Sequence, residues 1–155
     1  MDIENAAARR WGPLLVTLQF VLLALLAWQA LARLANSPVP LGAATCAAAG
    51  VLLGVWAVST NRPGNFNIRP QPREGGRLIE QGPYRWIRHP MYSALLLAGL
   101  AAAWIAATAR GWAALLALAV VLAIKAGVEE AAMLEAHAGY RDYRQRTKRF
   151  VPGLY

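Results

Sequence analysis

Charged residues, and acidic ones above all, are scarce in this sequence. Only 8 of the 155 residues are Asp or Glu and 16 are Lys or Arg, whereas 57% are hydrophobic. Soluble domains use about 45–50% apolar and about 25% charged residues. A chain this poor in charge cannot cover a soluble surface, so the composition predicts an integral membrane protein built as a single membrane domain.

Cysteine, histidine and the common nucleotide-binding motifs are also rare or missing. Cys46 is the single cysteine, which excludes an intramolecular disulfide and a cysteine-based metal site. His89 and His137 lack a third ligand at helical spacing, and Glu135 fits a solvated contact better, so we expect no metal. Ser93 has no second histidine placed to activate it. No GxGxxG motif or P-loop is present, so a soluble nucleotide-binding fold is not expected.

Long apolar runs dominate what remains. A transmembrane helix needs about 20 predominantly apolar residues, and the chain holds four runs near this length with almost no charge. We therefore expect an all-α integral membrane fold of four transmembrane helices, over residues 14–35, 41–59, 91–109 and 112–130.

The basic residues indicate how these helices are oriented. Short connections at 36–40 and 110–111 make neighbouring spans antiparallel, which places the N-terminus, the loop 60–90 and the tail 139–155 on one side. Thirteen of the sixteen basic residues lie on that side. The positive-inside rule predicts that this side and both termini are cytoplasmic. Topology and membrane lipids account for the net charge of +8, so nucleic acid is not an expected partner.

The loop and the tail have different character. The loop 60–90 is rich in Pro and Gly, but Gly82 and Pro83 can start a short helix that carries Tyr84, so we expect an ordered segment. The tail 139–155 has a helical spacing of aromatic and polar side chains, with basic residues on another face. It predicts an amphipathic helix on the anionic leaflet, with one face formed by Tyr140, Tyr143, Thr147 and Phe150.

The third span opens with a possible anion-binding sequence, from Arg88 to Tyr92. Pro90 suits the first helical position, so His89 should be the N-cap and the N–H groups of Met91 and Tyr92 should be free. A free helix start beside Arg88 would hold a carboxylate or phosphate. The segment equally fits an interfacial arginine next to an ordinary N-cap.

Two glutamates end the fourth span. The helical rise delivers Glu129 and Glu130 to the cytoplasmic end where the third span starts. Consecutive residues point about 100° apart, so we expect one glutamate to face inward and the other to face solvent or a basic partner. Lys125 shares a face with Glu129 and would pair with it, which favours Glu129 as the pocket residue. A helix that simply emerges into water would also carry such charges.

These motifs, taken in order, resemble a known family. The chain is similar over residues 60 to 155 to the integral-membrane isoprenylcysteine carboxyl methyltransferase and phospholipid N-methyltransferase group. The similarity rests on motif order, through Gly82-Pro83-Tyr84-Arg85, Arg88-His89-Pro90-Met91-Tyr92, Glu129-Glu130, Gly139-Tyr140, Tyr143 and Arg149-Phe150-Val151-Pro152.

The resemblance implies S-adenosylmethionine as cofactor and methyl transfer to a lipophilic acceptor at the cytoplasmic face. It implies that Arg88 orients an anionic acceptor and that the glutamates bind polar groups of the cofactor. The implied catalytic residues are Arg88, Glu129 and Glu130. The implied cofactor-binding residues are Gly82, Pro83, Tyr84, His89, Pro90, Tyr92, Glu129 and Glu130.

The acceptor and the rival functions stay open on sequence alone. An isoprenylcysteine-type carboxylate needs no general base, whereas a lipid amine must first lose a proton, so the residues slightly favour the carboxylate. A small four-helix transporter that uses Lys125, Glu129 and Glu130 is the alternative function. A lipid-binding anchor would explain the basic tail alone. The sequence does not indicate an oligomeric state.

Overall fold

A computed structural model describes residues 3–61 and 77–154 of the chain, and every regular element in these ranges is helical. The predicted loop residues 62–76 lie outside the described residues. The elements are α1 (Ile3–Leu34), α2 (Leu41–Thr60), the 3-10 helix η1 (Gly82–Arg85), α3 (Pro90–Ala106), α4 (Ala109–Ala136) and α5 (Tyr140–Arg146).

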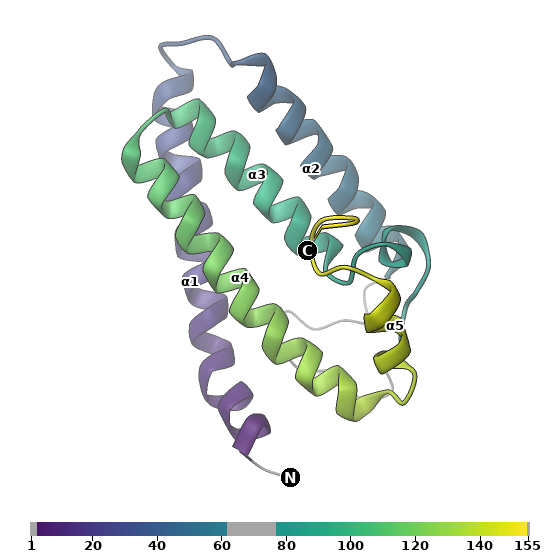
Figure 1. Ribbon diagram of the computed structural model, residues 1–155. Helices are drawn as coiled ribbons and strands as arrows, with labels where there is room; N and C mark the ends of the chain where they lie inside the picture. Colours follow the sequence, from purple (N-terminus) through teal and green to yellow (C-terminus); the bar gives the residue numbers. More distant parts are fainter. Residues whose placement is uncertain (1–2, 62–76, 155) are drawn as a thin grey trace.

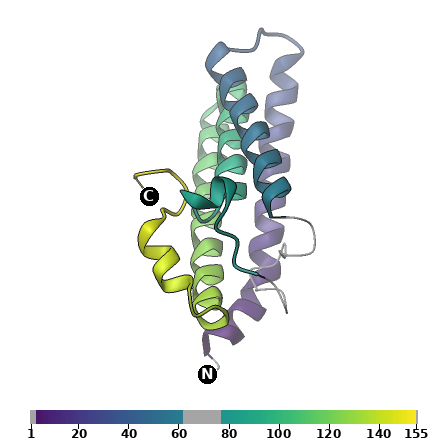
Figure 2. The same cartoon turned by 90° about the vertical axis from the view of Figure 1, so that its right-hand side faces the viewer.

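The four long helices lie side by side in one bundle (Figure 1). α3 packs against α1, α2 and α4, and α1 also packs along α4. Figure 2 shows that α5 and the chain end lie outside the bundle, beside the end at which α3 begins. The core holds mainly aliphatic side chains of α4, with Leu26 of α1 and Phe150 of the tail. α3 is thus the central helix, and its first turn lies beside α4 and the tail.

Three of the helices are long and apolar enough to cross a membrane: Trp11–Leu34, Leu41–Thr60 and Ala109–Ala136. α3 is a shorter apolar helix of 17 residues. Leu116, Val120 and Ile124 follow one another at four-residue spacing on α4 and leave more than half of their surface exposed. An exposed stripe of aliphatic side chains along a helix favours contact with lipid rather than with water. The chain is an integral membrane protein.

The predicted boundary between the third and fourth spans is wrong. α3 ends at Ala106 because Ala107 adopts a left-handed conformation with φ of 50°. Thr108 then caps α4, and its hydroxyl accepts a hydrogen bond from the N–H of Gly111 at 3.0 Å. Arg110 and Gly111, predicted to form the turn, therefore lie in the first turn of α4. The sequence interpretation missed the Thr cap because alanine continues across the break.

The predicted tail helix is wrong in its length. α5 ends at Arg146, and Thr147 after it is extended. Tyr140 and Tyr143 are buried on α5, but Thr147 and Phe150 are buried beyond its end. The spacing of these four side chains therefore reflects packing against the rest of the protein, and the placement of the tail on the leaflet stays a prediction.

Candidate cofactor site

The turn before α3 is shaped by a glycine. Gly82 has φ of 56°, and a Cβ added there would lie 2.5 Å from the Thr60 hydroxyl at the end of α2. Only glycine adopts this conformation in this space without strain. Tyr84 follows in η1 and is buried, and its carbonyl accepts a hydrogen bond from the Tyr143 hydroxyl at 2.8 Å. The predicted short helix is confirmed, and α5 is attached to it.

The chain after α5 runs parallel to the segment that leads into α3. The two segments form a single bridge between Ile87 and Lys148. The N–H of Arg88 donates to the Lys148 carbonyl at 2.8 Å, and the N–H of His89 donates to the Arg149 carbonyl at 3.1 Å. One turn into α3, the hydroxyl of Ser93 donates to the Phe150 carbonyl at 2.6 Å. The tail therefore holds the entrance of α3 in place.

At the start of α3 the predicted N-cap is confirmed, but the backbone N–H groups predicted to be free are not all free. Pro90 is the first helical residue and His89 is the N-cap. The backbone N–H groups of Tyr92 and Ser93 both donate to the His89 carbonyl, at 3.0 Å each. The expectation that the Tyr92 N–H is free is therefore wrong, because the first turn closes on its own cap residue. Side chains, rather than backbone donors, make the site.

Glu130 is a buried acceptor for several cations. It is 2% exposed, and its carboxylate lies 2.9 Å from Arg88 Nε and 3.1 Å from both His89 Nε2 and Arg149 Nε. Arg144 Nε lies 3.6 Å away. A carboxylate among so many charged donors is an ion-pair centre that joins α3, α4 and the tail.

Glu129 lies on the more open side of the same cluster. Its side chain is 21% exposed, accepts a hydrogen bond from the Tyr92 hydroxyl and approaches His89 Nδ1 at 3.4 Å. Both glutamates thus reach the His89 ring, one at each nitrogen. The expectation that one glutamate has basic partners is confirmed for Glu130, which pairs with arginines. Glu130 is nevertheless the more buried of the two glutamates.

His89 is held in a charged environment. Burial alone would lower the pKa of His89, but the hydrogen bonds and charges of Glu129 and Glu130 outweigh burial and raise its pKa above the ordinary value. The ring also stacks on Tyr92, with centroids 5.3 Å apart and planes within 2°. The two glutamates therefore favour the protonated form of the His89 ring.

Arg88 is largely committed to protein partners. Its Nε contacts Glu130, and its Nη1 donates to the carbonyl of Arg144 at 3.2 Å and to that of Thr147. This guanidinium ties α5 and the tail to the glutamate. The geometry gives Arg88 a role in holding the site.

The predicted ion pair between Lys125 and Glu129 is wrong within the described residues. Lys125 Nζ instead donates to Gln19 Oε1 of α1 at 2.9 Å and lies 5.0 Å from the centroid of the Tyr92 ring. The four-residue spacing placed Lys125 on the correct face, but a polar residue of α1 accepts its hydrogen bond. The apolar first span holds two glutamines, Gln19 and Gln29, and the sequence interpretation considered neither as a partner.

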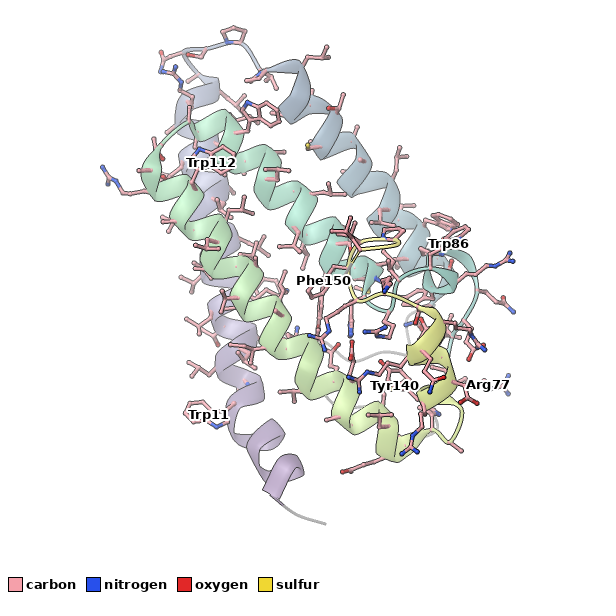
Figure 3. All side chains as sticks on the ribbon, viewed as in Figure 1. Trp11, Arg77, Trp86, Trp112, Tyr140 and Phe150 are labelled. Atoms are coloured by element: carbon pink, nitrogen blue, oxygen red, sulfur yellow. The ribbon has the colours of Figure 1, made fainter. Side chains whose placement is uncertain are left out.

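An open cavity adjoins the cluster on the side of α5. It has a volume of about 700 Å³ and meets the ion-pair centre through Arg144. The side chains around this part of the molecule, including Tyr140 and Phe150, are drawn in Figure 3. The residues that line the cavity are Leu134, Ala138, Arg141, Asp142, Arg144 and Gln145.

The model of one protein family matches residues 43–135, which is more than half of the chain. That family is described as the isoprenylcysteine carboxyl methyltransferase (ICMT) family. The chain belongs to the ICMT family. The match spans η1, the start of α3 and both glutamates, but not α1 or the tail. A search of the curated proteins found no match.

Membership of the ICMT family makes this protein a membrane methyltransferase and confirms the resemblance seen in the sequence. It gives no support to the transporter alternative. Sequence reasoning gathered His89, Tyr92 and the glutamates correctly but missed Gln19, Ser93 and the role of Arg149 as a partner of Glu130.

Proposed function

We propose that this ICMT-family protein transfers a methyl group from S-adenosylmethionine to a lipophilic acceptor at the cytoplasmic membrane face. The acceptor is an isoprenylcysteine-type carboxylate or a lipid amine. The observation that supports this proposal most is the partly exposed carboxylate of Glu129, which is held by Tyr92 and His89 in a chain of this family.

The residues present fit the cofactor. S-adenosylmethionine carries two cationic groups, a sulfonium and an ammonium, and when bound it supplies an electrophilic methyl group. Glu129 offers a negative charge at an exposed edge, where it can attract either of these cationic groups. Under this proposal Glu129, His89 and Tyr92 bind the cofactor, and Pro90 fixes the helix start that carries them.

The remaining predicted residues form the wall of the site or hold its parts together. Gly82, Pro83 and Tyr84 form the wall beside α2, and Pro83 and Tyr84 are buried there. Glu130 and Arg88 hold the tail against α3 rather than reach toward a ligand. We therefore assign Glu130 and Arg88 to positioning, and Glu129 to the contact with the cofactor.

The protonation of His89 affects whether the site suits an amine or a carboxylate acceptor. An amine acceptor must give up a proton before methyl transfer, and the raised pKa of His89 favours its protonated form, which cannot accept that proton. A carboxylate acceptor needs no base, so alignment and exclusion of water are sufficient. The site favours the carboxylate.

The acceptor reaches the site from the bilayer. The cluster lies at the end of the bundle that carries the start of α3 and the basic α5, and exposed aliphatic side chains surround the helices. We propose that this end, with both termini, is cytoplasmic, in a protein that crosses the membrane several times.

Methyl-transfer assays test this function. Purified protein is incubated with methyl-labelled S-adenosylmethionine and either a prenylated cysteine with a free carboxylate, the matching amide, or an aminolipid. We expect label in the free carboxylate only. Glu129→Gln should lower the rate at least tenfold, which corresponds to about 1.4 kcal/mol, because the amide lacks the negative charge that attracts the cofactor. Label in the aminolipid alone would show that the acceptor is an amine rather than a carboxylate. No transfer to any acceptor would contradict the proposed function.

A further inference from the structure

The open cavity beside α5 has no role in the proposed reaction, although positive charge lines it. Its volume of about 700 Å³ lies in the range of ligand pockets. Arg141 and Arg144 line it with the amide of Gln145, and Asp142 is the one acidic side chain among the described lining residues. Because the planar guanidinium matches the oxygens of a phosphate, this lining favours an anion of that class.

The two arginines of the cavity keep donors for a ligand. The side chain of Arg141 is exposed and makes no ion pair or hydrogen bond within residues 3–61 and 77–154. Arg144 approaches Glu130 with its Nε at 3.6 Å, and 48% of its side chain is exposed. Asp142 offsets one of the two charges, so the lining keeps a net positive charge.

An apolar stripe of α4 leads to the same cavity. Leu116, Val120 and Ile124 are each more than half exposed. Leu134, which lines the cavity, follows Leu116 by about five helical turns and therefore lies on the same face of α4. Gly127 lies between them and leaves the surface open, since no atom is within 4 Å of an added Cβ. An acyl chain can follow this stripe while its headgroup occupies the cavity.

The depth of the cavity also fits a lipid headgroup. Trp112 lies in the first turn of α4 and is 46% exposed, as aromatic side chains at a membrane interface commonly are. From Trp112 to Leu134 the helix rises about 33 Å, close to the thickness of about 30 Å of a hydrocarbon core. The cavity therefore lies at the level of the headgroups of the opposite leaflet, outside the bundle where Figure 2 shows α5.

We propose that the cavity between the end of α4 and α5 binds the phosphate of an anionic phospholipid, with Arg141 and Arg144 as its partners and an acyl chain along the α4 stripe. Free phosphate has the same oxygens but no chain to cover the stripe, which is why the occupant is a lipid. The inference is independent of the proposed function, because it uses none of the residues assigned to the cofactor.

Native mass spectrometry of the purified full chain tests this site. The protein is released from micelles that hold phosphatidylglycerol and phosphatidylcholine in equal amounts. Wild-type protein should retain one phosphatidylglycerol in preference to phosphatidylcholine. Retention should fall about fivefold in Arg141→Gln and more than tenfold when Arg144→Gln is added, because each arginine near an anionic headgroup contributes about this much. Excess inorganic phosphate should not displace the lipid.

Arg85→Gln is the matched control. Arg85 is exposed at the same end of the bundle, but it does not line the cavity, so its loss should leave retention unchanged. An equal loss in Arg85→Gln and Arg141→Gln would show diffuse attraction by the net charge and overturn the inference. If the protein with Arg144→Gln does not fold, Arg141→Gln alone decides.

Two further results would overturn the inference. Wild-type protein that shows no preference for phosphatidylglycerol would exclude the site, and displacement of the lipid by inorganic phosphate would show a site for a free anion. The binding of S-adenosylmethionine is measured separately, so neither result contradicts the proposed function.

Discussion

At the scale of single residues, two adjacent glutamates do different work. Glu130 is buried among charged donors, whereas Glu129 is partly exposed and contacts a tyrosine and a histidine. The sequence interpretation expected Lys125 to pair with Glu129. In the structure the arginines instead gather on Glu130.

Glu130→Gln should therefore destabilise the protein strongly. The substitution removes the buried carboxylate that contacts Arg88 and Arg149, and the Arg88 guanidinium is itself buried. Breaking a buried ion pair in this way costs about 3–5 kcal/mol. Glu129→Gln should change unfolding by less than about 1 kcal/mol and should instead weaken cofactor binding. Thermal melting in detergent distinguishes the two, and equal melting temperatures would contradict the assignment.

Stability should also depend on pH through His89. Its folded pKa is raised, so the charged ring contributes stability that is fully present below the unfolded pKa of about 6.5 and is lost as pH rises through the folded value. His89→Gln should lack this contribution. The melting temperatures of wild type and variant are compared from pH 5.5 to 9. A difference that grows with rising pH would show that the sign is wrong.

At the scale of elements, the site depends on how the tail and η1 are attached to the helices. The turn at Gly82 places η1 against α2, and the tail pairs with the segment before α3. Neither attachment involves a long regular element. Both fix backbone that would otherwise leave polar groups unpaired.

Gly82→Ala should disturb this arrangement. The left-handed backbone costs about 1–2 kcal/mol for a residue with a Cβ, and that Cβ would clash with Thr60. Gly127→Ala is the control, because no atom lies within 4 Å of an added Cβ there and alanine favours a helix by about 1 kcal/mol. Melting and cofactor binding are measured for both. A Gly82→Ala protein as stable as Gly127→Ala would contradict the account.

The elements also show which parts of the fold could be predicted from the sequence. Apolar runs located all four long helices, and Pro90 located the start of α3, because hydrophobicity and proline act locally. The break after Ala106 and the end of α5 at Arg146 were missed. The first depends on one threonine cap, and the second on pairing with a segment about 60 residues away. The contacts of Gln19 and Arg149 likewise come from tertiary packing and leave no local pattern.

At the scale of the whole molecule, the bundle has two unlike ends. One end carries the short connections between α1 and α2 and between α3 and α4 (Figure 1). The other carries the site, α5 and most of the basic residues within 3–61 and 77–154. This difference predicts the orientation in the membrane.

Cysteine labelling in intact cells tests that orientation. With Cys46 replaced by Ser, a cysteine at Asn36 should react with an impermeant reagent, and a cysteine at Gln145 should react only after the membrane is opened. Both positions are exposed in the fold. Labelling of the Gln145→Cys protein from outside, with Asn36→Cys protected, would invert the topology.

The central claim is that the cluster of Glu129, His89 and Tyr92 binds S-adenosylmethionine. Calorimetric titration of the purified protein with S-adenosylmethionine, and with its demethylated product, measures this binding directly. We predict one saturable site for each, with affinity at least tenfold weaker in His89→Ala and Tyr92→Phe, because the contacts to Glu129 are lost while the helix start keeps its backbone bonds. Wild-type affinity in both variants, or no saturable binding by the wild type, would contradict this claim.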